Sequence, residues 1–305
     1  RPLAIGGVAS MGPPVVLARG IVTDPYSDGQ VELTATAAGA LAYVGGQRSV
    51  RTLRVVDARG RPLADLTTGD IRDVRVSPTG DAVAYEQVDE TTGGRDIWVV
   101  PTTGGTPVRL SRHPGHDLAP AWSPEGRRVY YLSRRDAQAL LVSAPAAGGA
   151  EAIHFAFEGD AIPLEITRDG RALLYQQQDQ ESGWDIWMRP LDGGASAALV
   201  RGPASEQAAA ISPDGRWIAY SSPEAQGRQI YVEPMPADGR RWRVSEEHGR
   251  QPLWSADGRT LFFHGHERLL MRMPMTAAGP GANRTGAVPL FTIPMRGYDV
   301  RYHYG

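Results

Sequence analysis

A short phrase returns six times along the chain and constrains the fold more than any other feature. The clearest copy is Ser212–Tyr220, which reads Ser-Pro-Asp-Gly-Arg and then an apolar run ending in an aromatic residue. The glycines that mark the six copies are Gly39, Gly80, Gly126, Gly170, Gly215 and Gly258, at intervals of 41, 46, 44, 45 and 43 residues. A period of about 40–45 residues built from short strands is typical of a β-propeller. The repeat therefore predicts that architecture before any function is considered.

The fifth copy shows how one repeat can form a blade. Residues 206–212 are small and apolar, which suits an inner strand close to a central axis. Residues 213–215 (Pro-Asp-Gly) predict a turn, because proline presets φ and glycine accepts a positive φ. Residues 216–221 alternate as a second strand does, and strands are also expected at 229–232 and 241–244. Each repeat thus predicts a blade of four antiparallel strands.

Six repeats predict an all-β, six-bladed β-propeller of four-stranded antiparallel blades. The expected blades cover about residues 30–69, 70–114, 115–158, 159–203, 204–247 and 248–292. Residues 1–29 are expected to contain a closing outer strand, and residues 293–305 a closing inner strand, because a closed ring leaves no sheet edge free. The alternative is a ring of seven blades, with the last formed from both termini.

Composition narrows the class of protein. The chain has 305 residues, 41% of them hydrophobic, and a formal net charge of -2, so it lacks the basic balance of a nucleic-acid binder. No apolar run approaches the ~18 residues of a membrane span, so no direct membrane insertion is expected. The absence of cysteine excludes disulfides and suits a periplasmic or extracellular location, with the cytoplasm left open. Because the chain starts at Arg1, we expect a mature form or an excised domain. We also expect a monomer.

Two aromatic residues and the acids before them stand out on the expected third strands. The segments Asp96–Val99 and Asp185–Met188 are near copies that both begin Asp-Ile-Trp. We expect Trp98 and Trp187 to fill the space between neighbouring sheets rather than to stack on a ligand. We expect the two aspartates to bind backbone near the Ser-Pro turn rather than to act in catalysis.

Among sequence motifs for catalysis or metal binding, the chain contains one weak candidate, a pair of histidines. No Gly-x-Ser-x-Gly elbow of a hydrolase is present, nor the His-Arg-Asp and Asp-Phe-Gly motifs of a kinase. His264 and His266 are two residues apart, so on a strand both could face one metal ion, and His248 lies one strand earlier. A polar residue is ordinary where a strand runs into its loop. We therefore expect no catalytic residue and no cofactor, with a divalent cation at these histidines as the alternative.

The connections between blades are a better candidate for a site. Loops from each outer strand to the next inner strand should meet on one face, around the mouth of the channel. Their polar residues are Asp28, Gln30, Asp70, Arg72, His116, Asp117, Asp160, Glu206, Gln207, His248 and Arg250. The repeat does not need these residue types, and ligands favour concave places where polar groups converge. The sequence thus predicts a binding site for a protein or peptide partner, against the alternative that these side chains only solvate a water-filled channel.

The repeated phrase, together with Asp-Ile-Trp, resembles the WD-like, TolB-type bacterial propeller repeat over nearly the whole chain. Within that group, residues 212–220, 230–232, 241–245 and 252–255 resemble the propeller found C-terminal to bacterial Ser/Thr protein kinases. The resemblance implies a non-catalytic sensor or protein-binding domain of a larger or exported bacterial protein. TolB, a periplasmic member, binds a lipoprotein across one mouth of its ring.

Two other functions stay open. Oligogalacturonate lyases of similar fold hold a metal with histidines, so a metal-dependent polysaccharide-active enzyme using His248, His264 and His266 is one alternative. An accessory propeller of a missing kinase or hydrolase domain is the other.

Overall fold

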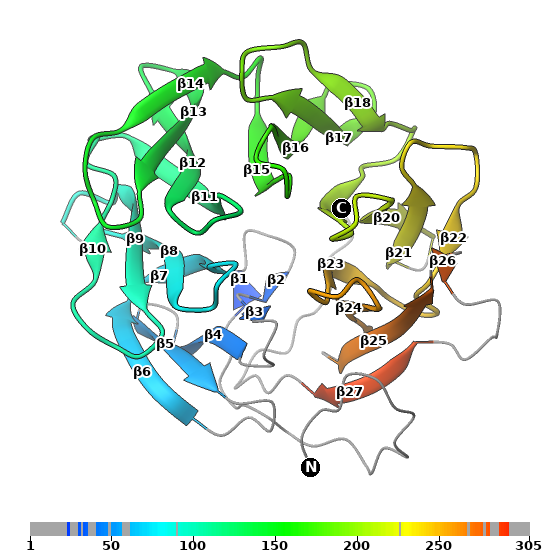
Figure 1. Cartoon of the computed structure of the whole chain (residues 1–305), viewed down its shortest axis with the longest axis horizontal. Helices are drawn as coiled ribbons and strands as arrows, with labels where there is room; N and C mark the ends of the chain where they lie inside the picture. The colour runs from blue at the N-terminus through cyan, green and yellow to red at the C-terminus, as the bar shows by residue number, and fades with distance from the viewer. Residues whose placement is uncertain are drawn as a thin grey trace.

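Antiparallel sheets stand around a central axis, so the fold is an all-β propeller as the repeat predicts (Figure 1). The structure is a computed structural model. It describes residues 23–24, 30–31, 33–35, 41–47, 50–56, 62–89, 91–225, 227–266, 269–276, 279–280 and 287–292. Within these ranges no helix has the length and apolar character needed to cross a lipid bilayer.

Five blades contain four strands each, paired in chain order from the axis outward. The first blade is β3 (Leu33–Ala35), β4 (Leu41–Gln47), β5 (Val50–Val56) and β6 (Pro62–Gly69). The second blade is β7 (Ile71–Val76), β8 (Ala82–Val88), β9 (Arg95–Pro101) and β10 (Val108–Arg109). The third blade is β11 (His116–Trp122), β12 (Arg128–Arg135), β13 (Gln138–Pro145) and β14 (Ala152–Ala156).

The remaining two blades follow the same plan. The fourth blade is β15 (Ala161–Ile166), β16 (Ala172–Asp179), β17 (Gly183–Pro190) and β18 (Ala197–Val200). The fifth blade is β19 (Gln207–Ile211), β20 (Trp217–Glu224), β21 (Gly227–Pro234) and β22 (Trp242–Arg243). The fifth blade thus has its four strands where the repeat places them.

The prediction of six four-stranded blades is wrong, because the sheet after the fifth blade has five strands. This five-stranded sheet consists of β23 (Arg250–Trp254), β24 (Thr260–His264), β25 (Leu269–Thr276), β26 (Gly279–Pro280) and β27 (Val288–Thr292). β25 is long enough for two short strands to share its edge: Met275 and Thr276 pair with β26, and Leu269 to Arg272 pair with β27. Gly279, with φ at 111°, permits the tight return to β25.

The seven-blade alternative is also wrong. The one further sheet among the described residues has two strands, β1 (Thr23–Asp24) and β2 (Gln30–Val31), rather than the four of a blade. The terminal segments that were expected to close the ring, within residues 1–29 and 293–305, lie outside the described residues except for these two short strands.

The repeated phrase forms the turn between the first two strands of a blade. In the fifth blade the Ser212 hydroxyl donates to Asp214 Oδ1 at 2.6 Å and accepts the Trp217 N–H at 3.0 Å. The hydrogen bond from Ser212 is the main reason that the pKa of Asp214 falls to about 2. Ser255 and Asp257 form the same turn in the five-stranded sheet. The phrase therefore serves local structure and not a ligand.

The core lies between neighbouring sheets, and its centre is the aromatic residue of the second strand. The side chains of Tyr85, Tyr131, Tyr175, Tyr220 and Phe263 are at most 2% exposed. By contrast, Trp98 and Trp187 are partly buried and pack against the edges of these clusters. The third-strand tryptophans do fill space between sheets, but the tyrosines are buried more completely.

Candidate functional site

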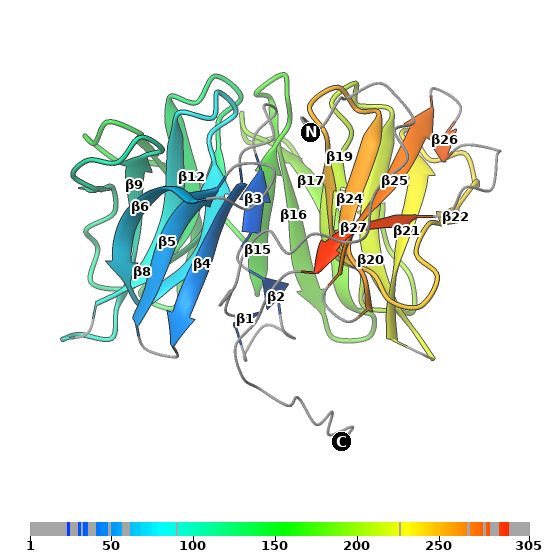
Figure 2. The same ribbon diagram turned by 90° about the horizontal axis from the view of Figure 1, so that it is seen from below.

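One face of the ring carries the start of each inner strand, and we call it the mouth face. His116, the first residue of β11, pairs with Arg134 near the end of β12, so outer-to-inner connections and second-to-third hairpins share this face. The Ser-Pro turns lie on the opposite face. Figure 2 shows the two rims of loops, with the strands running between them. The inner strands lie nearest the axis (Figure 1).

A β-bulge recurs near the mouth in the inner strands β7, β11, β19 and β23. Each bulge holds a non-glycine residue with positive φ: Asp73 at 28°, Ala119 at 53°, Ala208 at 52° and Gln251 at 50°. Each of these residues stands four positions before the serine of the turn. A side chain in this backbone region costs about 1–2 kcal/mol, and bulges redirect the side chains around them. The fold therefore gives these four inner strands the same shape where they enter the channel.

Alternation along the inner strand divides the predicted mouth residues into two groups. We count positions back from the Ser or Thr that begins the turn of the repeated phrase, and call it the turn residue. The residues seven and five positions before it share one side of the strand, and the residue between them faces the other side. The first group contains Asp70, Arg72, His116, Asp160, Gln207, His248 and Arg250, all partly or fully exposed. The second group contains Asp117 and Glu206, which are buried. Of the other two predicted residues, Asp28 and the side chain of Gln30 lie outside the described residues.

Two ion pairs occupy the exposed side. Arg72 donates to both carboxylate oxygens of Asp70 at 3.4 and 3.3 Å. Arg134, from the end of β12, pairs with Asp160 at 2.8 Å. The latter pair lines a cavity of about 300 Å³ at the third blade and its connection to the fourth, with Phe157 also in the lining. The mouth face thus presents charged groups of both signs in different blades.

Asp117 and Glu206 lie between blades instead of at the rim. Neither oxygen of Asp117 has a hydrogen-bond partner, although the side chain is completely buried. Glu206 accepts a hydrogen bond from Ser222 at 3.1 Å on one oxygen and has no partner on the other. Burial raises the pKa of both carboxyl groups. A partner protein on the mouth face would not contact them directly.

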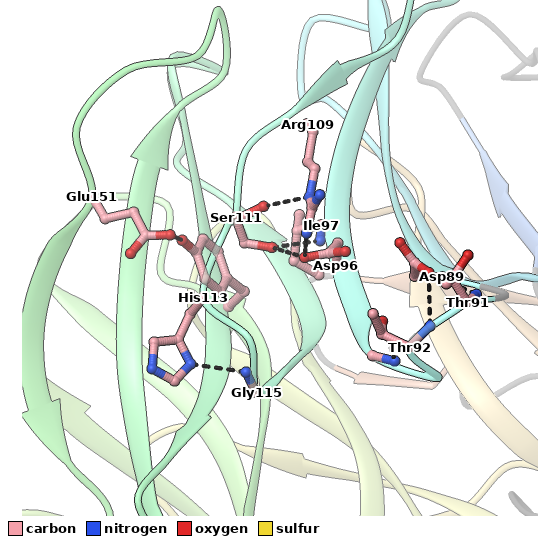
Figure 3. Close-up of polar contacts among 12 residues, drawn as sticks. Asp89, Thr91, Thr92, Asp96, Ile97, Arg109, Ser111, His113, Gly115 and Glu151 are labelled. Carbon is pink, nitrogen blue, oxygen red and sulfur yellow. Dashed lines mark hydrogen bonds and ion pairs between the residues drawn. The ribbon is translucent and has the colours of Figure 1, made fainter.

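The third-strand aspartates bind groups other than those of the Ser-Pro turns. Asp96 accepts from Arg109 at 2.8 Å, and the Ser111 hydroxyl stands 3.5 Å away and accepts the Ile97 N–H (Figure 3). Asp185 accepts from Ser182 at 2.8 Å and lies 3.5 Å from Arg201. The expectation of a bond near the Ser-Pro turn is therefore wrong. Asp96 instead bonds to Arg109 on the outer strand β10, and Asp185 bonds to Ser182 in the hairpin before β17 and lies near Arg201 after β18.

The three candidate metal ligands lie together at the five-stranded sheet, with arginines among them. His264 is opposite Arg250 in the pairing of β23 with β24. His248 Nε2 accepts a hydrogen bond from Arg250 Nε at 2.9 Å, and His266 Nδ1 lies 3.7 Å from Glu247. Across the described part of the chain, no group of three or more His, Asp or Glu side chains is arranged to hold a metal ion.

Glu165 is a channel residue that the sequence analysis missed. It lies on β15, and its Oε1 accepts the N–H of Ile211 on the next inner strand at 2.7 Å. The positive charge of Arg75, on β7 two blades away, acts to lower the pKa of Glu165. Because two inner strands so far apart in the ring approach each other only at the centre, Glu165 lies by the axis. Burial raises its pKa to about 7. The sequence did contain a signal. In the other described inner strands, the residue two positions before the Ser or Thr that begins the turn is Thr34, Arg75, Ala121, Ala210 or Leu253, so an acid at this position is found in β15 alone among them.

The raised pKa of Glu165 predicts a pH-dependent stability. A carboxyl group whose pKa is higher in the folded state favours folding fully below its ordinary pKa of 4.5, and loses this contribution as pH rises through 7. Glu165→Gln keeps the acceptor for Ile211 without the charge. We expect the variant to match the wild type at pH 4.5 and to exceed its free energy of unfolding by about 3 kcal/mol at pH 8, as the pKa shift from 4.5 to about 7 implies. Urea denaturation at both pH values measures this, and an equal difference at both would contradict it.

Comparison with known proteins establishes the family. The model of the TolB beta propeller domain matches residues 39–256, which is most of the chain. The chain belongs to this family. The TolB-like propeller agrees with the resemblance carried by the repeated phrase. The match ends within the five-stranded sheet, after its first inner strand.

Relatives of this TolB-type propeller include a protein named as a putative TolB and proteins named as enzymes. It is 33% identical over 136 residues to Tricorn protease homolog 1 of Streptomyces coelicolor, covering 43% of this chain and 12% of that protein. A putative TolB from Agrobacterium tumefaciens has a TM-score of 0.59 and 20% identity, over 74% of this chain and 86% of that one. An oligogalacturonate lyase in complex with manganese has a TM-score of 0.61 and 14% identity, over 84% and 74%. The two structures share the fold, and the chain spans only about an eighth of the Tricorn homologue's length.

Proposed function

We propose that this propeller is a non-catalytic binding domain that holds a protein or peptide across its mouth face. The observation that supports this is the variation at one repeated position. The residues seven positions before the turn residue in successive inner strands are Asp70, His116, Asp160, Ser205 and His248. The backbone around them is uniform, with the same bulge in four of these strands. A uniform scaffold that carries different polar groups suits recognition of an extended, chemically varied surface.

Known relatives support the proposal only at the level of the fold. TolB structures are similar to this chain, whereas the Tricorn homologue and the lyase are named as enzymes. The described residues provide no hydrolase elbow, and no histidine cluster among them is arranged for a metal. We propose that the domain works as part of a larger or exported bacterial protein, in the periplasm or outside the cell. We also propose a sensor role, in line with the resemblance of residues 212–220 and 241–245 to propellers that follow kinase domains.

Charge reversal on the two faces tests the proposal. Peptides are first selected on the immobilised chain from a displayed random library, and their affinity is measured by calorimetry. Arg72→Glu and Asp160→Arg are expected to weaken binding about tenfold or more, since an opposed charge at an interface costs over 1.4 kcal/mol.

The matched control is Arg216→Glu on the opposite face. Arg216, like Arg72, pairs with an aspartate two residues earlier, Asp214, at 2.8 Å. We expect this variant to bind as the wild type does. Binding that survives both mouth variants, or that is lost only with Arg216→Glu, would reject the mouth face as the site.

A further inference from the structure

We infer that a cavity at the third blade binds an aromatic side chain of the bound peptide. The inference rests on the proposed function, because it names the group that anchors a peptide on the mouth face. The cavity has a volume of about 300 Å³ and lies between the β12–β13 hairpin and the connection from β14 to β15. We call it the third-blade cavity, and the residues that line it include Arg134, Ala137, Ala139, Ala156, Phe157 and Asp160.

The connection after the third blade packs less closely on its hairpin than in the next two blades. In the fourth blade a Cβ added to Gly183, the first residue of β17, would come within 3.1 Å of Ser205 in the connection, and the fifth blade has the same close approach at the first residue of β21. In the third blade Gln138 stands at this position. A Cβ added to Gly159, in the connection, would have no atom of the described residues within 4 Å. The third blade therefore leaves open a space that its neighbours close.

Much of the wall of the cavity is apolar. Ala137, Ala139 and Ala156 line it together with Phe157, whose side chain is 8% exposed. Ala137 has φ at 65° in the second position of a two-residue hairpin turn, where glycine is usual, and such strained residues gather at functional sites. A space of this size would hold about ten water molecules at ~30 Å³ each. An apolar group that displaces loosely held water from such a wall gains affinity.

The ion pair at the cavity favours an aromatic ring over other apolar groups and over ions. Arg134 Nη2 donates to Asp160 Oδ1 at 2.8 Å, so an ion could enter only by displacing one member of the pair. This bond uses the edge of the guanidinium and leaves its flat face for a ring, on which arginine stacks well. Arg189 stacks in this way on Phe155, 4.0 Å from the centre of the ring. An aromatic side chain would therefore suit both the apolar wall and the arginine.

Titration of the full chain, labelled with carbon-13 at its alanine methyl groups, with N-acetyltryptophanamide tests the cavity. The ring current of an aromatic group shifts the NMR signals of methyl groups beside it, so we expect saturable shifts at Ala137, Ala139 and Ala156. Ala172, which lies beside the turn on the opposite face, should not shift. N-acetylleucinamide and N-acetyllysinamide should bind about fivefold more weakly or less, because neither carries a ring to stack on Arg134 and Phe157.

Substitutions at the cavity show where the probe binds. Ala156→Phe fills the cavity and should abolish the shifts at Ala137 and Ala139. The matched control is Ala152→Phe, at the exposed opposite end of β14, which should leave binding unchanged. Arg134→Gln should weaken binding about threefold through the loss of stacking, and it should fold normally because the ion pair that it removes is exposed. Circular dichroism melts check the fold of all three, and Arg134→Gln decides the matter if Ala156→Phe does not fold.

Several outcomes would overturn the assignment. These are shifts that grow linearly with the tryptophan probe, equal or tighter binding of the leucine or lysine probe, or shifts that persist in folded Ala156→Phe. The selected peptides separate this inference from the proposed function. If they bind the mouth face with an affinity that is unaffected when each aromatic residue is replaced by leucine, the aromatic anchor is rejected and the binding function stands. If the tryptophan probe binds in the cavity but no peptide binds the chain, the binding function is rejected instead.

Discussion

Tyr131→Ala is expected to reduce the free energy of unfolding by about 3–5 kcal/mol, the range for truncation of a large buried aromatic residue. The ring is completely buried between the second and third blades, where it packs in one cluster with Trp122, Leu110 and Ile97. Its removal leaves a cavity that the two β-sheets cannot close, because their backbones are tied by ladder hydrogen bonds. Urea denaturation followed by tryptophan fluorescence measures the loss.

Two further variants show whether packing is the cause. Tyr131→Phe keeps the ring and removes only the hydrogen bond to Glu151 at 2.9 Å, so we expect a loss of about 1–2 kcal/mol. Trp187→Ala removes a larger but partly exposed side chain and should cost less than Tyr131→Ala. If the tryptophan variant were the less stable of the two, the assignment of the core to the second-strand aromatic residues would be incorrect.

Gly115→Ala is the second substitution with a large expected effect. A Cβ on Gly115 would overlap the carbonyl oxygen of Arg134 and come within 3.0 Å of His113 Nδ1. The Gly115 N–H already donates to that nitrogen, as Figure 3 shows, so the loop cannot move without breaking this bond. We expect a loss of about 1–3 kcal/mol in the free energy of unfolding, as for other overpacked sites. Because His116 follows directly, the start of β11 should also shift.

Gly202→Ala provides the control for that substitution. Gly202 also lies in an outer-to-inner connection, but the nearest atom to its added Cβ is an oxygen of Glu206 at 3.4 Å. This is ordinary contact, so the free energy of unfolding should change by less than about 0.5 kcal/mol. Equal effects of the two alanines in thermal melts would show that loss of glycine freedom, and not the clash with Arg134, is responsible.

Local patterns in the sequence account for the successful part of the fold prediction. The Ser212–Gly215 turn needs only residues close in sequence, with Ser212 and Asp214 bonded to one another and to neighbouring backbone. The strand positions follow from alternation around each such turn. The extra strand β26 at the outer edge of the five-stranded sheet could not be predicted in this way, because it is only two residues long and its residues, Gly279 and Pro280, are not typical of a strand.

The candidate site was predicted as a region but not in its details. The expected mouth residues do begin the inner strands, yet Asp117 turns away between blades while His116 stays exposed. The alternation rule could have separated these neighbours if the direction of the strand relative to the axis had been known. Glu165 was missed because its environment depends on Ile211 and Arg75, which come from two other inner strands.

The sequence by itself determined the repeating blade, since turn chemistry and two-residue alternation act over a few neighbouring residues. It also determined that the residues at the start of each inner strand differ from blade to blade. The tertiary structure decided which of these residues face the channel mouth, which are buried between sheets, and how many strands the last sheet holds. It also decided that His264 lies opposite Arg250 in the pairing of β23 with β24. These properties depend on contacts between residues far apart in the chain, and burial and charge there are set by the neighbouring sheet.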